Sequence, residues 1–284
     1  MIPAAFDYVR ASSLTQAIDL LRDDPDGTKL LAGGHTLLPA LKLRLAAPAL
    51  LIDIGGLAEL KGIEISETGI RIGALTTHAE LFASELLNKE VPVFRQAASL
   101  IADPQVRNRG TIGGSLANAD PAADWPAVVV ALQAEVEIAG PNGLRRVAAR
   151  DFFVDIFSTV LEGGEILASI HIPRPKPDMR FIYRKIRHPA SGFAVVGVAV
   201  GVRLQHGVVA EISIGVTGAA NHAFAGQHAA DFLTGKTLSR DNIDQAAKLL
   251  SETTECLSDR YASAEYRANL IRIETTRGLL ALSS

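Results

Sequence analysis

The chain of 284 residues is long enough for two domains, and hydrophobic residues make up 48% of it. With 21% charged residues, this composition excludes disorder as the main state, and the net charge of −3 removes the electrostatic basis for nucleic-acid binding. The single cysteine, Cys256, excludes an internal disulfide, a C-x-x-C zinc or redox motif and an iron–sulfur cluster held by this chain. Any redox chemistry must therefore come from a bound organic cofactor.

The apolar character of the chain does not indicate a membrane protein. The mean hydropathy is +0.21, but no apolar run approaches the length of a membrane span. We interpret the excess as surface that is buried against other subunits. The first residues carry neither the basic segment nor the apolar segment of a signal peptide, so we expect a cytoplasmic protein.

The first part of the chain alternates apolar strands with helices. We predict strands at 6–9, 29–32 and 50–54, a helix that begins with a capping box at Ser13 and Gln16, and a second helix over 37–45. The loops after the second and third strands contain paired glycines. This β-α-β-α-β pattern predicts a small α/β lobe over about residues 1–55.

After residue 56, the pattern of alternating strands and helices gives way to segments in which apolar residues alternate with period two. Alternating apolar residues at 60–65 and 69–74 predict an antiparallel hairpin, and helices are predicted near 77–84 and 91–102. We expect a long polar loop over 103–124, followed by strands at 135–139 and 165–172. Loops of this length in compact domains usually have a function.

Alternating prolines at 173–177 predict an extended linker, and we place a domain boundary near residue 177. After it, the pattern predicts three strands and then two amphipathic helices, at 181–187, 193–204, 208–217, 242–255 and 262–282. A run of strands followed by a run of helices indicates an α+β domain.

Two glycine pairs lie in similar surroundings. The first glycine motif is Ala32-Gly33-Gly34-His35-Thr36, and the second is Thr111-Ile112-Gly113-Gly114-Ser115. Consecutive N–H groups without a Cβ can bind an anion such as a diphosphate, although Gly-Gly is also common in ordinary turns. No G-x-G-x-x-G is present, and Gly235-Lys236-Thr237 lacks the first glycine of a P-loop, so we interpret Gly235 as a helix C-cap.

With the residues that follow them, Leu37-Leu38-Pro39 and Leu116 to Pro121, the two motifs resemble the FAD-binding medium subunit of aerobic-type carbon monoxide dehydrogenases. These enzymes belong to the molybdenum hydroxylases, the family of xanthine dehydrogenase. The resemblance covers nearly the whole chain. It implies an α+β protein with a vanillyl-alcohol-oxidase-type FAD domain at 1–177, with lobes at about 1–55 and 56–177, and a small C-terminal α+β domain at 178–284.

The resemblance also implies which residues contact FAD. Diphosphate and ribityl contacts fall on Ala32, Gly33, Gly34, His35, Thr36, Leu37, Thr111, Gly113, Gly114, Ser115 and Asn118. Asp124 matches an acidic residue that accepts hydrogen bonds from cofactor hydroxyls, and Ile101 and Leu167 match apolar contacts.

Two further matches lie at the flavin ring. Lys185 matches a lysine at the flavin edge, where its charge favours reduced, anionic flavin. Phe193 matches an aromatic residue that stacks on the ring, although it could equally be a core residue at the start of a strand. The family commonly has aspartate where this chain has Gly192. His78 is expected to be a polar residue at a helix start, near the cofactor.

The implied function is electron transfer. A large partner subunit with molybdopterin would oxidise the substrate, and a small partner with two [2Fe–2S] clusters would pass electrons to non-covalently bound FAD in this chain, which would discharge them to an external acceptor. The expected assembly is a heterotrimer that pairs into a dimer, with no catalytic residue for the substrate and no metal in this chain. The alternatives are a stand-alone flavoprotein oxidase of a small alcohol and a cofactor-free interaction module. Substrate (carbon monoxide, an N-heterocycle or an aldehyde) and acceptor (NAD, a quinone or a cytochrome) stay open.

Overall fold

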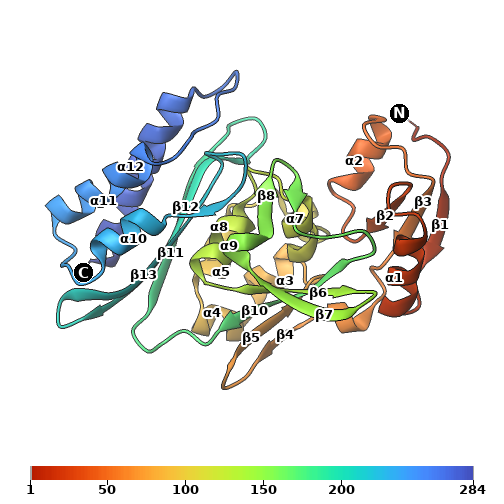
Figure 1. The fold of residues 1–284 in the computed structure, drawn as a ribbon, viewed down its shortest axis with the longest axis horizontal. Helices are drawn as coiled ribbons and strands as arrows, with labels where there is room; N and C mark the ends of the chain where they lie inside the picture. Colours follow the sequence, from red (N-terminus) through yellow and green to blue (C-terminus); the bar gives the residue numbers. More distant parts are fainter. Residues whose placement is uncertain (1, 284) are drawn as a thin grey trace.

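The structure, a computed structural model, describes residues 2–283 and contains three main sheets that lie side by side along the molecule (Figure 1). The first is a parallel sheet of order β1-β3-β2, made of β1 (Asp7–Arg10), β2 (Thr28–Leu31) and β3 (Leu50–Asp53). Two helices connect these strands, α1 (Leu14–Asp23) and α2 (Leu37–Lys42). This first lobe agrees with the predicted β-α-β-α-β unit.

Only half of the predicted capping box forms at the start of α1. The Ser13 side chain accepts a hydrogen bond from the N–H of Gln16, as expected for an N-cap. The Gln16 side chain, however, accepts from the N–H of Ser12 at 2.7 Å and not from that of Ser13. A complete capping box is present at Thr77 and Glu80, before α3.

The second lobe is built around a five-stranded antiparallel sheet of order β4-β5-β10-β6-β7. Its strands are β4 (Ile63–Ile65), β5 (Gly69–Gly73), β6 (Glu135–Gly140), β7 (Gly143–Ala148) and β10 (Ile166–Pro173). The short elements around it are η1 (Ala58–Leu60), α3 (His78–Ala83), α4 (Glu85–Glu90), α5 (Val93–Ser99), α6 (Pro104–Arg107), α7 (Ile112–Asn118), α8 (Asp124–Ala131), α9 (Ala149–Phe152), β8 (Phe153–Asp155) and β9 (Ser158–Thr159). Trp125, Phe94 and Phe152 are the largest of the fully buried side chains.

The predicted loop over 103–124 was wrong, because this segment contains α6 and α7. Asp103 caps α6 by accepting from the N–H of Val106, with Pro104 at the first helical position, and Thr111 caps α7. The glycine pair inside α7 conceals the helix, because glycine has a low helix propensity. Helix α8 was not predicted either, because all of its residues are buried and it therefore has no amphipathic period.

The C-terminal domain is an antiparallel sheet with helices, as predicted. Its strands follow the order β11-β12-β13-β14. The elements are β11 (Arg180–Arg187), β12 (Ala194–Gln205), β13 (Val208–Thr217), β14 (Phe224–Ala225), α10 (Gln227–Leu233), α11 (Arg240–Glu252) and α12 (Ala264–Leu282). Gly235, with φ of +78°, follows α10 as the expected C-cap glycine.

Helix α8 joins the second lobe to the C-terminal sheet. It packs on β12 and β13, while α12 packs on β11 and β12. A Cβ at Gly215 of β13 would lie 2.0 Å from the carbonyl oxygen of Ala127, so the strand can approach α8 this closely only with glycine at that position. Among residues 2–283, no helix has both the length and the hydrophobicity to cross a bilayer.

Candidate functional site

The first glycine motif presents a strip of unpaired backbone donors. Between β2 and α2, the N–H groups of residues 33–36 donate no hydrogen bond to any other residue within the described range 2–283. Thr36 is the N-cap of α2 but makes no side-chain cap bond, and both His35 and Thr36 are exposed. We call these four N–H groups the amide strip. Such a strip fits a diphosphate, because it offers adjacent backbone donors, two of which belong to glycines without a Cβ.

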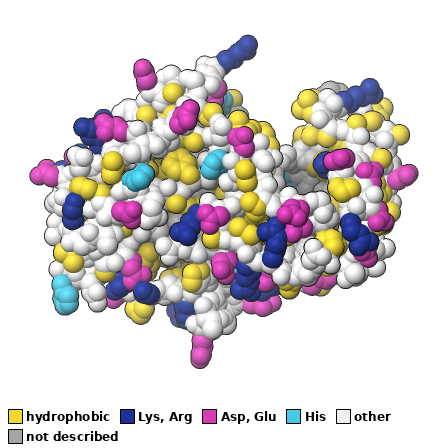
Figure 2. Space-filling view, viewed as in Figure 1, with side chains coloured by type: hydrophobic (Ala, Val, Ile, Leu, Met, Phe, Trp, Pro, Cys, Tyr) yellow, Lys and Arg dark blue, Asp and Glu magenta, His cyan; other side chains and the backbone are white. Residues whose placement is uncertain are grey.

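The two glycine motifs lie together although 80 residues separate them in the sequence. A Cβ on Gly33 would come within 2.1 Å of the carbonyl oxygen of Arg109, so the first motif rests directly on the backbone that leads into α7. Figure 1 shows α7 on the side of the second lobe that faces the first lobe, and Figure 2 shows a hollow between these two parts of the molecule. The amide strip therefore lies at the junction of the two lobes.

The second glycine motif differs from the first, because its amides are already paired. The N–H groups of Ile112 and Gly113 donate to the carbonyl oxygens of Thr76 and Ala74, at 3.0 and 2.9 Å. Those of Gly114 and Ser115 donate to the side chain and carbonyl of Thr111, at 3.1 and 3.0 Å. The second motif is thus a capped helix start and not a second strip of free donors.

What α7 presents instead is a small polar face. Gly114 is exposed, and Ser115 and Asn118 are half-buried and one helical turn apart. The side chains of Ser115 and Asn118 make no hydrogen bond to other residues of the described chain. They are available as hydrogen-bonding groups for a ligand.

The two glycines of α7 have different roles. A Cβ at Gly113 would lie 2.5 Å from the Cβ and 2.7 Å from the carbonyl oxygen of Ala74, so Gly113 is required for packing against the second lobe. A Cβ at Gly114 would meet only the hydroxyl of Thr111, at 2.8 Å. Gly114 therefore leaves a bare stretch of backbone at the surface.

A buried histidine lies beneath this junction. His78 begins α3, as the sequence indicated, and its backbone N–H donates to the carbonyl oxygen of Gly110 at 2.9 Å. Its Nδ1 accepts a hydrogen bond from Nε1 of Trp125 at 3.0 Å. Burial, aided by the charges of His35 and Arg107, lowers the pKa of His78 to about 4. His78 is thus neutral at pH 7, with its proton on Nε2. The sequence did not predict the hydrogen bond between His78 and Trp125, because Trp125 lies in α8, a helix that was not predicted.

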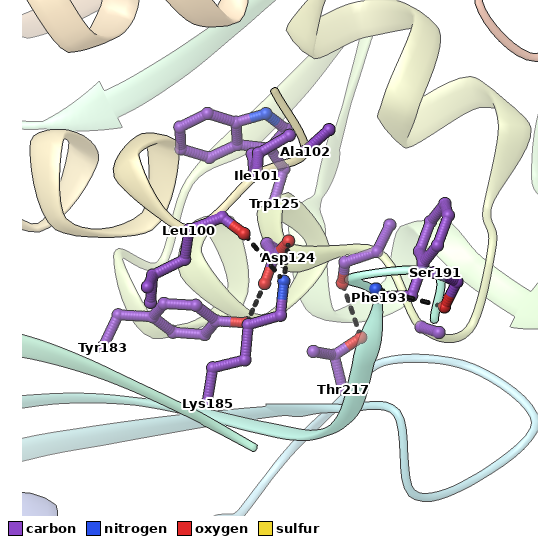
Figure 3. A network of polar contacts seen from close by, with 12 residues as sticks. Leu100, Ile101, Ala102, Asp124, Trp125, Tyr183, Lys185, Ser191, Phe193 and Thr217 are labelled. Atoms are coloured by element: carbon purple, nitrogen blue, oxygen red, sulfur yellow. Dashed lines mark hydrogen bonds and ion pairs between the residues drawn. The ribbon is translucent and has the colours of Figure 1, made fainter. Parts of the chain in front are cut away.

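Asp124, Lys185 and Tyr183 form a buried polar cluster (Figure 3). Asp124 accepts from the Tyr183 hydroxyl at 2.5 Å and from Nζ of Lys185 at 2.8 Å, and Lys185 also donates to the carbonyl oxygen of Leu100 at 3.2 Å. Burial raises the pKa of Asp124, which the adjacent Lys185 ammonium opposes, and it lowers the pKa of Lys185. Burial also raises the pKa of Tyr183.

The side chain of Lys185 is only 1% exposed, and that of Asp124 only 6%. Both groups are already paired with each other, and the cluster links the start of α8 to β11. Direct contact of Asp124 or Lys185 with FAD therefore stays a prediction. Tyr183 was missed in the sequence, although its spacing of two from Lys185 places both on one face of a strand.

The three apolar candidates lie in different environments. Leu167 on β10 is 5% exposed and belongs to the core of the second lobe, and Ile101, just after α5, is partly buried against that core. Phe193 is 46% exposed, at the end of the connection between β11 and β12, so it is not a core aromatic. Figure 3 shows it apart from the polar cluster and next to Ser191, whose Oγ accepts a hydrogen bond from the N–H of Phe193 at 3.4 Å.

Comparison with known families agrees with this geometry. A family model described as the FAD binding domain in molybdopterin dehydrogenase matches residues 4–175, and one described as the CO dehydrogenase flavoprotein C-terminal domain matches residues 181–282. The chain belongs to the FAD-binding subunits of the molybdopterin dehydrogenases. The resemblance inferred from the glycine motifs is thereby confirmed, as are the fold class, FAD as the cofactor and the oxidoreductase class. Molybdenum and iron–sulfur cofactors in this family belong to other subunits.

Relatives of this FAD-binding subunit have different substrates in their names. It is 38% identical to the carbon monoxide dehydrogenase medium chain of Afipia carboxidovorans, over 98% of this chain and 97% of that protein. It is 35% identical to the glyceraldehyde dehydrogenase medium chain of Sulfolobus acidocaldarius, over 98% of both. The solved structure of carbon monoxide dehydrogenase from Oligotropha carboxidovorans matches with a TM-score of 0.96 and 37% identity, over 100% of this chain and 99% of that chain. The structure of quinoline 2-oxidoreductase from Pseudomonas putida matches with a TM-score of 0.93 and 34% identity, over 100% of this chain and 98% of that chain.

Proposed function

We propose that this FAD-binding subunit transfers electrons within a molybdenum hydroxylase complex. In this proposal, a small partner subunit with [2Fe–2S] clusters supplies the electrons, and an external acceptor removes them. Bound FAD supplies the redox chemistry itself. The chain's own residues bind the cofactor, orient it and control access to it.

The amide strip carries this proposal. Its four N–H groups have no acceptor among residues 2–283 and lie at the junction of the lobes, where adjacent backbone donors can hold the two phosphates. We propose that Ala32 and Leu37 flank the diphosphate, and that Thr111, Gly113, Gly114, Ser115 and Asn118 border the ribityl portion. In this arrangement Ser115 and Asn118 contribute hydrogen-bonding side chains, whereas Gly113 and Thr111 keep α7 in place.

The remaining candidates are proposed to border the ring and adenosine portions. Phe193 is exposed and can stack on the flavin, and Gly192 beside it adds no side chain. We assign Ile101 and Leu167 to the apolar wall. We propose that Asp124 accepts hydrogen bonds from cofactor hydroxyls and that Lys185 lies at the flavin edge, while their ion pair links the start of α8 to β11.

The proposed assembly is a cytoplasmic heterotrimer, with a molybdenum-binding large subunit and an iron–sulfur small subunit, that pairs into a dimer. Names such as "medium chain" among the relatives support a complex of several subunits. We retain the division at residue 177 as the proposed domain boundary. The names of the relatives include carbon monoxide, glyceraldehyde and nicotine, so the substrate of this complex is left open.

Purification of the chain alone and with its co-purifying partners tests the proposal. We expect the isolated chain to bind one FAD, to release it on acid precipitation and to show negligible flavin reduction by carbon monoxide, aldehydes or small alcohols. The complete complex should reduce the flavin with its own substrate. Reduction of the isolated chain by a small alcohol would instead favour a stand-alone oxidase, and a chain without bound flavin would refute the cofactor site.

A further inference from the structure

Hydrogen bonds of His188 hold together the connection between β11 and β12, residues 188–193, in which the N–H of Phe193 also donates to Oγ of Ser191 at 3.4 Å. The backbone of His188 donates to the carbonyl oxygen of Phe193 and accepts from the N–H of Gly192, both at 2.8 Å. Its side-chain Nδ1 accepts from the N–H groups of Ala190 and Ser191, at 3.3 and 3.2 Å. We call this segment the Phe193 turn. The backbone and the side chain of His188 together make four of the hydrogen bonds that shape this turn.

A second segment supports the turn from outside. The ring of His188 packs against the ring of Tyr261, with centroids 4.3 Å apart and planes inclined by 60°. Tyr261 lies between α11 and α12, in a turn whose N–H groups at Tyr261 and Ala262 both donate to Oδ1 of Asp259 at 2.8 Å. The aromatic ring of Tyr261 is therefore presented to His188 by a structured turn.

Both segments are attached to Arg267 on α12. Arg267 is 6% exposed, and its guanidinium donates to the carboxylate of Asp259. The same guanidinium donates to the carbonyl oxygens of Val195 and Gly218, at 2.6 and 2.5 Å. Val195 follows Phe193 by two residues. One buried cation thus fixes the start of β12 and the segment that carries Tyr261.

We propose that His188 and Tyr261 are positioning residues that fix the direction of the Phe193 side chain. This inference depends on the proposed function, in which Phe193 lies against the flavin. Phe193 is 46% exposed, so core packing does not determine where its ring points. The turn sets its backbone, and the Tyr261 ring limits the movement of the turn.

A tryptophan reporter can measure this restraint directly. Phe193→Trp places an indole at the exposed site, whereas the single native tryptophan, Trp125, is fully buried and thus protected from acrylamide. The reporter is combined with Tyr261→Ala and with its matched control Tyr261→Phe, which keeps the ring. It is likewise combined with His188→Ala and with His188→Asn, whose Oδ1 can still accept from the two amides. Acrylamide quenching is measured without cofactor, and quenching of the indole emission by FAD is measured in a titration.

Both alanine variants should raise acrylamide quenching of the reporter by about two-fold, because a mobile turn exposes the indole. They should also weaken quenching of the reporter by FAD, because the indole then points away from the flavin ring. The Tyr261→Phe and His188→Asn variants should behave like the parent. The FAD dissociation constant should change less than about two-fold, because the amide strip is untouched. Unchanged acrylamide quenching in Tyr261→Ala would overturn the proposal. Absence of FAD binding in every variant would refute the proposed function, while the cofactor-free measurement would still decide whether the two residues restrain the turn.

Discussion

A Cβ on Gly33 would come within 2.1 Å of the carbonyl oxygen of Arg109, so the backbone of the first lobe contacts that of the second lobe without an intervening side chain. This contact places the amide strip beside α7. The same contact makes the geometry of the proposed cofactor site dependent on how the two lobes pack.

We therefore expect Gly33→Ala to damage both folding and cofactor binding. The added methyl group must push backbone away from backbone, which should lower the free energy of unfolding by about 1–3 kcal/mol. Urea unfolding and flavin content per chain measure the two effects. Gly163→Ala is the matched control, because its Cβ would meet only the side chain of Pro25, at 3.3 Å, in another contact between the lobes. Equal behaviour of the two variants would contradict the importance of the Gly33–Arg109 contact.

Substitutions at the two glycines of α7 should distinguish effects on stability from effects on FAD binding. Gly113→Ala would collide with Ala74 and should lower stability together with flavin content. In Gly114→Val the added side chain lies at the surface, so the variant should lose only about 1 kcal/mol of its free energy of unfolding, from the disturbed Thr111 cap. It should nevertheless lose FAD binding. Thermal unfolding and FAD titration distinguish the two variants. A Gly114→Val chain that binds FAD with the parent affinity would remove α7 from the proposed site.

His78 predicts a dependence of stability on pH. Its pKa is about 4 in the folded chain, below the ordinary value of 6.5, so between these values the unfolded chain takes up a proton that the folded chain does not. The contribution of neutral His78 to the free energy of unfolding should be fully present above pH 6.5. It should decrease by up to about 3 kcal/mol as the pH falls to 4. Urea unfolding across this range gives the slope. In His78→Asn, whose Oδ1 can still accept from Trp125, the slope should be flatter, and an identical slope would show that His78 does not titrate as inferred.

The Asp124–Lys185 pair predicts non-additive effects of substitution. Asp124→Asn leaves the Lys185 ammonium buried without its counter-charge and should lower the free energy of unfolding by about 3–5 kcal/mol. Lys185→Met should lower it similarly, because Asp124 is then left alone. The double variant Asp124→Asn/Lys185→Met should be less destabilised than the sum of the single variants, which a double-mutant cycle measures. Simple additivity would mean that the two groups do not interact.

Local patterns were sufficient for much of the fold. The three long strands of the C-terminal domain and the parallel unit of the first lobe were predicted because alternation, apolar runs and glycine turns indicate them directly. Helix α7 was hidden by Gly113 and Gly114, whose low helix propensity is overridden by the Thr111 cap and by packing on Ala74.

The candidate site was predictable only where it depends on one segment. The amide strip follows from consecutive glycines in a loop, and its amides have no acceptor in the part of the chain that the structure describes. The pairing of the amides of α7 was not predictable, because the acceptors on Thr76 and Ala74 come from a different part of the chain. Likewise, nothing local to Lys185 indicates that its charge is buried against Asp124.

Helix α12 begins at Ala264, so it leaves the ribosome after both lobes and after the strands of the C-terminal sheet. Arg267, which holds Val195, Gly218 and Asp259, lies on that helix. The Phe193 turn and the segment that carries Tyr261 can therefore be attached to each other only after α12 has been synthesised. The first lobe, whose strands and helices end by Asp53, precedes both segments in the chain. The nascent chain thus contains the backbone of the amide strip before it contains the residue that supports the Phe193 turn, and a variant that lacks α12 would have the former without the latter.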